Sequence, residues 1–229
     1  MSRVVFDCDA VLFDMDGTLV DSREIVERMW IGWATEHDVP VQTALALAHG
    51  RRTLETMQLL APHLATPEEA ARLDALEAEQ EGSETAIPGA LALLSALPAD
   101  RWAIVTSAGH RLARRRIASV GLPAPRVLVG ADDVAAGKPS PEGYLHAAAQ
   151  LGVDVRRCIV IEDTPAGAEA GRSAGAKVIG LATTYPAVPF CDVLLSDLRA
   201  VQVVPAADGY AIRLSADPLP PLPNSRPPA

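Results

Sequence analysis

Short runs of apolar residues, each ending in polar or small residues, recur along the chain and predict buried β-strands. Residues 11–13 (Val-Leu-Phe) are too few for a helix and too continuously apolar for a strand with one face in water, so they suit a central strand. Further runs predict strands near 102–106, 126–129, 158–162 and 177–180. Their alternation with helical segments predicts an α/β fold with a parallel sheet. Right-handed crossovers place the first strand between those at 102–106 and 158–162.

Residues 22–86 interrupt this alternation with a helical pattern that is rich in Ala, Leu and Glu and contains no strand candidate. Glu24–Glu36 is predicted to be one helix, on which Trp30 and Trp33 are packed rather than exposed. Prolines and a glycine divide the remainder into short helices. We therefore expect the first strand to be followed by a small inserted helical unit.

The C-terminal end of the chain has a different composition from the rest. Residues 216–229 are rich in proline and are predicted to be a tail that forms neither helix nor sheet. Before the tail, Val201–Leu214 is predicted to form a small hairpin that turns at Asp208-Gly209. The predicted core is therefore discontinuous, and its two parts are residues 1–21 and 87–215.

Two aspartates follow the first predicted strand, Asp14 at its end and Asp16 two positions later, with Gly17-Thr18 next. In open parallel sheets, ligands bind at the carboxyl ends of the strands. An aspartate there can attack phosphorus and form an aspartyl-phosphate, while a second carboxyl protonates the leaving oxygen and later deprotonates water. An ordinary turn is the alternative, since Asp and Gly are common turn residues. Asp7 and Asp9 repeat the spacing without the Gly-Thr, and we interpret them as solvated N-terminal residues.

Two later segments carry groups that could bind phosphate. Thr106 ends the strand near 102–106, and its hydroxyl, with the backbone N–H groups of Ser107 and Ala108, predicts a phosphate-binding turn. A simple helix N-cap is the alternative. Further on, Lys138 is one of only two lysines among the 20 basic residues of the chain. A lysine in so arginine-rich a chain suggests that a compact point charge is needed there.

Adjacent acids, Glu162 and Asp163, end the predicted strand near 158–162. They would repel each other at the end of a buried strand unless a cation lay between them and Asp14. The alternative is that they cap the helix that Pro165 begins.

Taken together, these four segments resemble the four motifs of the haloacid dehalogenase-like hydrolase superfamily, and the resemblance covers the chain to about Leu214. It implies a Rossmann-like parallel sheet with a small helical cap that closes over the site. It also implies that Asp14 is the nucleophile and that Asp16 is the general acid and base. Thr106 would hold the transferring phosphoryl group, and Lys138 would neutralise its charge.

The same resemblance implies a Mg²⁺ cofactor. Its protein ligands would be the carboxylates of Asp14 and Asp163 and the main-chain carbonyl of Asp16, with Glu162 acting through a water molecule. An all-oxygen site with few protein ligands and several waters is what Mg²⁺ prefers.

Three features separate the reactions that occur in this superfamily. Its haloacid dehalogenases lack an acid two residues after the nucleophile, so Asp16 favours phosphoryl transfer. Its phosphonate-cleaving members use a cap lysine, and residues 21–87 contain none. Its sugar phosphomutases have a hinge histidine where this chain has Ile25 and Val26. Hydrolysis of a phosphomonoester is therefore predicted. A sugar phosphomutase, or a catalytically silent binding module on the same fold, is the alternative.

The segment His49-Gly50-Arg51-Arg52-Thr53 resembles the cap motif of a subgroup that dephosphorylates small sugar and polyol phosphates, including glycerol and 2-deoxyglucose phosphatases. The similarity extends to residues 88–90 and 102–107. Arg52 is therefore a candidate substrate-binding residue with Ser107 and Ala108, because an arginine fork matches phosphate or sugar hydroxyls. Exposed charges at a helix start are the alternative for both arginines, and His49 is interpreted as structural.

Composition limits the partners that we expect. With 229 residues, 49% of them hydrophobic, the chain can bury one α/β core and a small accessory unit. A net charge of −9 disfavours nucleic acid or an anionic membrane as a partner. No stretch is long and apolar enough to span a bilayer, and no basic-then-apolar leader is present. We therefore expect a cytoplasmic monomer that acts on a small phosphorylated molecule.

Two further groups of residues are interpreted as structural. The three cysteines are an odd number without metal-ligand spacing and are expected to be reduced thiols: Cys8, Cys158 and Cys191. A group of arginines at helical spacing after Thr106 is predicted to form a solvated face: Arg111, Arg114, Arg115 and Arg116.

Overall fold

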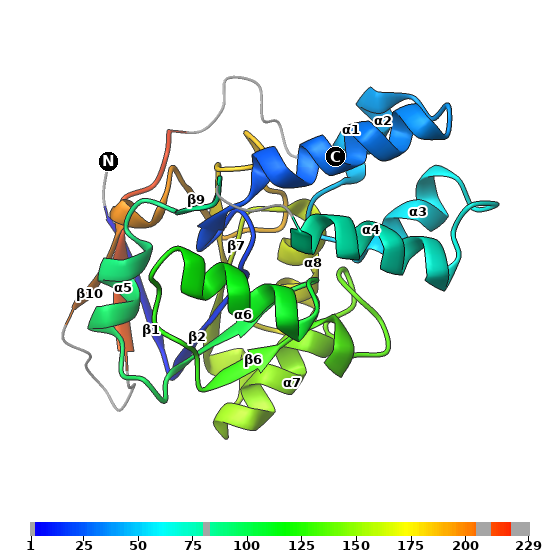
Figure 1. The fold of residues 1–229 in the computed structure, drawn as a ribbon. Helices are drawn as coiled ribbons and strands as arrows, with labels where there is room; N and C mark the ends of the chain where they lie inside the picture. The colour runs from blue at the N-terminus through cyan, green and yellow to red at the C-terminus, as the bar shows by residue number, and fades with distance from the viewer. Residues whose placement is uncertain (1–2, 80–82, 205–211, 221–229) are drawn as a thin grey trace, which may run out of the picture.

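The computed structural model describes residues 3–79, 83–204 and 212–220, and its centre is a six-stranded parallel sheet (Figure 1). The sheet has the order β6-β5-β2-β7-β8-β9. Its strands are β2 (Ala10–Phe13), β5 (Trp102–Val105), β6 (Val127–Val129), β7 (Cys158–Glu162), β8 (Lys177–Leu181) and β9 (Val193–Leu195). The predicted central position of the first strand is confirmed, because β2 pairs with β5 on one side and β7 on the other. The edge strand β9 is an addition to the predicted set.

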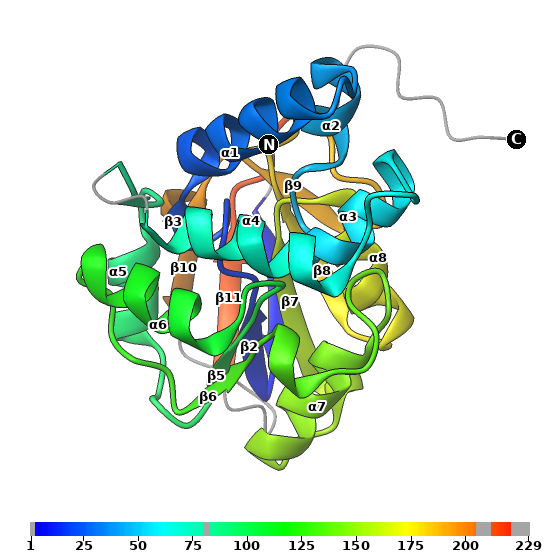
Figure 2. The ribbon, with the colours of Figure 1, turned by 45° about the vertical axis from the view of Figure 1, so that its right-hand side comes forward.

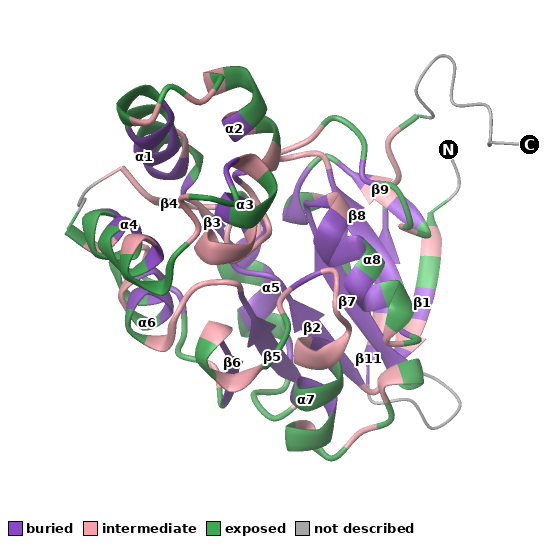
Figure 3. Ribbon diagram, turned by 90° about the vertical axis from the view of Figure 1, so that its right-hand side faces the viewer, coloured by how far each residue is buried: buried purple, intermediate pink, exposed green. Residues whose placement is uncertain are grey.

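Helices cover both faces of this sheet, which is why β2 is apolar at every position. Val11 and Phe13 pack on the face covered by α5 (Ala90–Ala96) and α6 (His110–Ser119). Ala10 and Leu12 pack on the opposite face, under helices α7 (Glu142–Leu151) and α8 (Pro165–Ser173). The strands are correspondingly buried along most of their length, the exceptions being Lys177 at the start of β8 and Leu194 in β9 (Figure 3). Each large apolar side chain buried in this way contributes about 1.5–3 kcal/mol.

A second, antiparallel sheet lies beside the α5 side of the core and has the order β1-β11-β10. Its strands are β1 (Val4–Cys8), β10 (Val201–Val204) and β11 (Ile212–Ala216). The predicted hairpin strands pair as expected, and the predicted turn at Asp208-Gly209 lies outside the described residues.

The prediction that Asp7 and Asp9 are solvated N-terminal residues is only partly right, because both side chains are partly exposed but each is paired with an arginine. Asp7 lies in β1 directly opposite Arg213 of β11, and the Arg213 Nη2 atom donates to its carboxylate at 2.9 Å. This pairing lowers the pKa of Asp7. Asp9 accepts a hydrogen bond of 2.8 Å from Arg157. The alternating burial of a strand explains the arrangement, since Phe6 and Cys8 face the core while Asp7 points to the other side.

Four helices form a separate layer above the sheet, and we call them the cap (Figure 2). They are α1 (Arg23–Glu36), α2 (Val41–Leu47), α3 (Thr53–Leu60) and α4 (Pro67–Glu79). Two short strands that the sequence did not predict, β3 (Val20–Asp21) and β4 (Thr85–Ala86), pair at the base of the cap. The cap has an apolar cluster of its own, in which Trp30 and Trp33 are both 2% exposed. The prediction that these tryptophans are packed is therefore confirmed.

The prediction that residues 216–229 form neither helix nor sheet is wrong at their start, where the first residues of the predicted tail are attached to the body of the molecule. Ala216 ends β11, one residue inside the segment predicted as tail. After it, the Asp217 N–H donates to Ala200 O at 3.0 Å and the Leu219 N–H to Leu194 O at 2.8 Å.

Among the described residues, no helix combines the length and the apolar character needed to cross a bilayer.

The three cysteines are free thiols, as expected. Cys8, in β1, and Cys158, in β7, are both buried. Burial raises the pKa of each of these two thiols to about 12. Such thiols stay protonated at neutral pH and are poor nucleophiles.

Candidate active site

The carboxyl end of β2 delivers two carboxylates to one place. Asp14 is 4% exposed, and its N–H donates to Ile161 O in the neighbouring strand at 3.0 Å. Gly17 then turns the chain away with a φ of +83°. A Cβ atom at this position would lie 2.0 Å from Asp163 Oδ2. Glycine is therefore required both by the backbone conformation and by the close approach of the last motif.

Lys138 connects the first motif to the last one. Its Nζ atom donates to the Asp14 carboxylate, to Val105 O at 3.1 Å and to Glu162 Oε1 at 2.6 Å. Tyr144 donates from its hydroxyl to the same Glu162 oxygen at 2.9 Å. Burial alone would lower the pKa of Lys138, but the charges of Asp14 and Glu162 outweigh it and raise that pKa above its usual value. The side chain is therefore a buried ammonium directly beside the candidate nucleophile.

Three carboxylates at this place outnumber the one ammonium. Asp14, Glu162 and Asp163 each offer an oxygen, and these oxygens lie within 4.8 Å of one another. Burial, followed by the charge of Glu162, raises the pKa of Asp163 to about 8. The excess negative charge and the all-oxygen donor set fit a hard divalent cation such as Mg²⁺.

The hydrogen bonds show which of these oxygens are available to a metal. Asp163 Oδ2 is buried and accepts no hydrogen bond within the described residues. Glu162 Oε1 already accepts from Lys138 and Tyr144, and its Oε2 accepts from the backbone N–H groups of Asp163 and Thr164. Lys138 donates to Oδ1 of Asp14, which leaves its Oδ2 for a ligand. Asp14 and Asp163 therefore suit direct coordination, while Glu162 orients Lys138 and the turn that carries Asp163.

The second motif lies at the end of β5, beside Asp14. Thr106 is 5% exposed, and its Oγ1 accepts the Ala108 N–H at 3.1 Å. Ser107 donates from its hydroxyl to Gly50 O of the cap at 3.1 Å. The motif therefore combines a local turn hydrogen bond with a direct contact to the cap. It does not cap α6, whose N-cap is Gly109 without a side-chain cap hydrogen bond.

A cleft of about 740 Å³ lies between the core and the cap. The core contributes the predicted residues Asp14, Asp16 and the Thr106–Gly109 turn to its lining, and the cap contributes residues 48–55 and part of α4. Lys138 lies beside a smaller cavity that shares Thr106 and Ser107 with this cleft. The structure thus brings the predicted catalytic residues to one end of the sheet, below a lid of cap residues.

Arg52 lines the cleft, but protein groups already accept its hydrogen bonds. Its Nε atom donates to Glu55 Oε1 at 2.9 Å, and its Nη2 atom to Ala135 O at 3.1 Å. The same Glu55 oxygen accepts the Gly137 N–H at 2.9 Å. Arg52 and Glu55 therefore fasten α3 to the core loop that leads to Lys138.

Two other residues of the cap motif, Arg51 and His49, lie close by. Arg51 contacts Lys138 O at 3.4 Å through Nη1. His49 also lines the cleft, and burial lowers its pKa, which favours a neutral imidazole.

The predicted solvated face of arginines is wrong at one position. Arg111 and Arg114 are exposed, and Arg115 is partly exposed and paired with Glu84, but Arg116 is 2% exposed. Its Nη1 atom donates to Asp16 Oδ1 at 2.8 Å, and its Nη2 atom to Glu77 Oε1 of the cap at 2.7 Å. Helical periodicity could have indicated this, because Arg116 shares its face of α6 with the buried residues Leu112, Ala113 and Ile117.

Comparisons with known proteins agree with the geometry. The family model described as haloacid dehalogenase-like hydrolase matches residues 8–175, which include all four motifs. Hexitol phosphatase A of Escherichia coli (strain K12) is 40% identical over 212 residues, covering 90% of this chain and 98% of that protein. Glycerol-1-phosphate phosphohydrolase 2 of Saccharomyces cerevisiae is 32% identical and covers 85% of this chain and 84% of its own. Among solved structures, a candidate beta-phosphoglucomutase from Bacteroides vulgatus has a TM-score of 0.71 at 27% identity, covering 84% of this chain and 85% of that one.

Proposed function

This chain belongs to the haloacid dehalogenase-like hydrolase family, and we propose that it is a Mg²⁺-dependent phosphatase of a small sugar or polyol phosphate. The similarity to Hexitol phosphatase A over 98% of that protein supports the substrate class. The observation that carries the proposal is the convergence of Asp14, Asp16 and Thr106 on one cleft, with Lys138 bonded to Asp14. The compartment and the monomeric state stay predictions.

In the first step, a carboxylate oxygen of Asp14 attacks phosphorus and forms the aspartyl-phosphate as the bond from phosphorus to the alcohol oxygen breaks. Asp16 donates its proton to that leaving oxygen, which departs as the free alcohol. In the second step, Asp16 takes a proton from water, whose oxygen bonds to phosphorus. Inorganic phosphate leaves, and the Asp14 carboxylate is restored.

Three groups would hold the charge that moves through these steps. Thr106 and the Ser107 N–H would bind the phosphoryl oxygens, since the Ala108 N–H already donates to Thr106 Oγ1. The Lys138 ammonium would offset charge at Asp14. When bound by Asp14, Asp163 and the Asp16 carbonyl, Mg²⁺ would offset the remaining negative charge of the phosphoryl group.

The cleft supports a small polar substrate. Its volume of about 740 Å³ is within the range of small-molecule sites, and acids and arginines line it beside Trp30 and Met29. Such a lining can hydrogen-bond the hydroxyls of a sugar or polyol.

Phosphate release from a panel of substrates tests this function. Sorbitol 6-phosphate, glycerol 1-phosphate, 2-deoxyglucose 6-phosphate and 6-phosphogluconate are each incubated with the enzyme in Mg²⁺ or in EDTA. We expect the polyol and sugar phosphates to release inorganic phosphate in Mg²⁺ only. Metal-independent turnover would contradict the proposed metal site, and no turnover of any of them would favour a binding module.

A sugar phosphomutase is the second candidate, and the structural similarity to the candidate beta-phosphoglucomutase favours testing it. Glucose 1-phosphate is followed by phosphorus NMR in the same conditions. Asp16 can activate water as readily as a sugar hydroxyl, so we expect inorganic phosphate to accumulate. Accumulation of glucose 6-phosphate ahead of inorganic phosphate would favour the mutase.

A further inference from the structure

Arg116 lies at the junction of three parts of the molecule. Its guanidinium contacts Asp16 in the loop after β2, Glu77 near the end of cap helix α4, and Glu84 just before β4. The Arg116–Glu84 distance is 3.8 Å, so this third carboxylate is an ionic neighbour rather than a close hydrogen-bond acceptor. A single buried cation thus joins the core, the cap and the segment that connects them.

The hydrogen bonds to Asp16 distinguish its two carboxylate oxygens. Arg116 Nη1 donates to Oδ1 at 2.8 Å, and Ser22, at the start of the cap, donates from its hydroxyl to the same oxygen at 2.7 Å. In the described part of the chain, both hydrogen bonds therefore end on Oδ1. The Asp16 side chain is 25% exposed and lines the cleft, so Oδ2 is the oxygen left for a ligand.

The position of Arg116 on α6 links the same helix to the phosphate-binding turn. The helix begins at His110, directly after the Thr106–Gly109 turn, and Arg116 lies on the buried face of its second half. Movement of α6 relative to the cap would displace the turn and the Arg116–Asp16 contact together. Helix α6 therefore connects the Thr106–Gly109 turn, where phosphate would bind, to Asp16, which would protonate the leaving oxygen.

We propose that Arg116 is a positioning residue that fixes the Asp16 carboxylate with Oδ2 toward the leaving oxygen, and that Glu77 holds Arg116 in this place when the cap is closed. The inference rests on the proposed phosphatase function. If the cap moved away, Glu77 would leave the guanidinium, and water could compete for its contact with Asp16. Proton transfer would then be efficient only over a closed site.

The test compares two substrates that differ in their need for a proton. Sorbitol 6-phosphate has an alkoxide leaving group that requires a general acid, whereas p-nitrophenyl phosphate releases a phenolate that does not. Because Asp16 also activates water in the second step, the readout is the single-turnover rate of release of the alcohol or phenolate, which reports the first step alone. We expect Arg116→Met to lower this rate for sorbitol 6-phosphate by roughly 10²-fold, the lower end of the effect of a general acid. The rate for p-nitrophenyl phosphate should fall less than about fivefold. Arg116→Lys, which keeps one charge but has no second arm, should recover part of the loss.

Matched variants separate positioning from a general structural defect. Arg114→Met changes an exposed arginine of the same helix and should leave both substrates unaffected. Glu77→Gln removes the charge on the cap side of Arg116 and should reproduce a smaller loss with the same substrate selectivity, whereas Glu79→Gln on the same helix should not. In an Asp16→Asn background, Arg116→Met should add little further loss, because the group that it positions is already inactive.

The outcomes for the inference and for the proposed function differ. Equal loss for the two substrates, a change in KM alone, or full additivity with Asp16→Asn would overturn the positioning role, with the fold checked by circular dichroism. If Arg116→Met does not fold, Arg116→Lys and Glu77→Gln give the same readout. A wild-type enzyme that turns over neither substrate in Mg²⁺ would overturn the proposed function, and this inference with it.

Discussion

The structure contains two buried cations, Lys138 and Arg116, that each contact a carboxylate of the first motif. Lys138 contacts Asp14, and its other carboxylate partner, Glu162, also belongs to the core. Arg116 contacts Asp16, and its other partners belong to the cap and to the segment after it. Lys138, which would stabilise the nucleophile, therefore has both of its carboxylate partners in the core. Arg116, which would orient the general acid, has all of its partners only when the cap is in place.

This difference indicates how the fold could link proton transfer by Asp16 to exclusion of bulk water from the site. A nucleophile held by core residues alone is ready whenever substrate arrives. An acid whose orientation depends on the cap works best when the cap also excludes bulk water.

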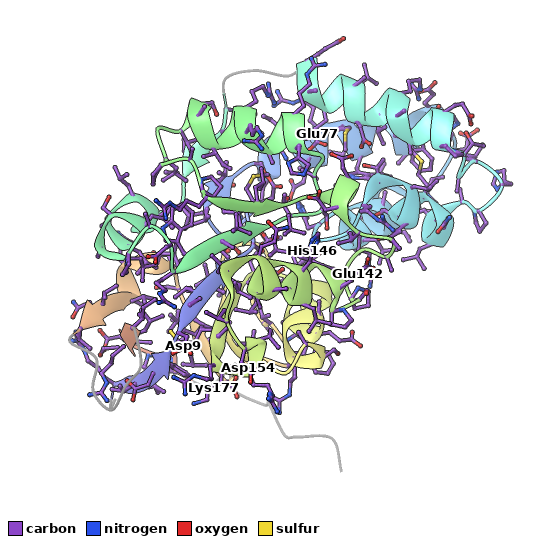
Figure 4. All side chains as sticks on the ribbon, turned by 90° about the horizontal axis from the view of Figure 1, so that it is seen from below. Asp9, Glu77, Glu142, His146, Asp154 and Lys177 are labelled. Atoms are coloured by element: carbon purple, nitrogen blue, oxygen red, sulfur yellow. The ribbon has the colours of Figure 1, made fainter. Side chains whose placement is uncertain are left out.

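Asp14→Asn should have the largest effect, because an amide cannot act as the anionic nucleophile and is also a weaker ligand for a metal. We expect kcat for sorbitol 6-phosphate to fall by on the order of 10⁴-fold or more. The matched control is Asp9→Asn, since Asp9 lies at the opposite end of the molecule from the cap residue Glu77 (Figure 4). Steady-state kinetics of the two variants measures the difference, and an active Asp14→Asn enzyme would exclude the proposed nucleophile.

Lys138→Met should reduce both activity and stability, because it leaves Asp14 and Glu162 buried without their cation. Removing one partner of a buried ion pair costs about 3–5 kcal/mol. The other lysine provides the control: Lys177 is exposed, near the same end as Asp9 (Figure 4). Urea unfolding should show a large fall in the free energy of unfolding for Lys138→Met and little change for Lys177→Met. Equal stability of the two variants would mean that the Lys138 contacts contribute little.

Asp163→Asn should separate metal binding from folding. In EDTA we expect the variant to be at least as stable as the wild type, because the substitution removes a buried carboxylate that Glu162 repels. Mg²⁺ should raise the Tm of the wild type but hardly that of the variant. Titration calorimetry should show a large rise in the Kd for Mg²⁺. Substituting a residue that only hydrogen-bonds a metal ligand typically weakens binding by about 10–100-fold, and loss of a ligand itself should exceed this. A Mg²⁺-dependent Tm rise that survives the substitution would place the metal elsewhere.

The same contrast explains how much the sequence alone could predict. Asp14, Thr106 and Asp163 were found because each directly follows an apolar strand, and parallel strands bring their carboxyl ends together. The partners of Arg116, in contrast, lie 39 and 100 residues away in the chain. No local pattern reports such distant contacts, and a run of arginines is ordinarily a solvated surface.

Strand β1 was missed for a similar reason. Its pairing partner β11 lies more than 200 residues further along the chain, as the Asp7–Arg213 pair shows, and its five residues alternate polar and apolar positions only weakly. Glu162 was recognised, but its bonds to Lys138 and Tyr144 follow from the packing of α7 against the sheet. Sequence patterns thus predict which residues lie at the strand ends, whereas tertiary packing determines which side chains contact them.

The smallest expected effect concerns a charge pair in the cap that is only partly buried. Glu69 of α4 accepts hydrogen bonds from Arg72 and from the Trp33 indole, and these, the Arg72 bonds foremost, lower its pKa to about 2. Because the folded-state pKa lies below the ordinary value of 4.5, this pair stabilises the protein above about pH 4.5. The contribution is lost as the pH falls toward 2.

Glu69→Gln should therefore flatten the dependence of Tm on pH between about 4.5 and 2, with a loss of less than about 1 kcal/mol at neutral pH because Arg72 is 41% exposed. Glu68→Gln changes an exposed neighbour on the same helix and should keep the wild-type slope. Thermal unfolding of the three proteins across this pH range measures the difference. A Glu69→Gln curve parallel to that of the wild type would mean that the pair adds nothing to cap stability.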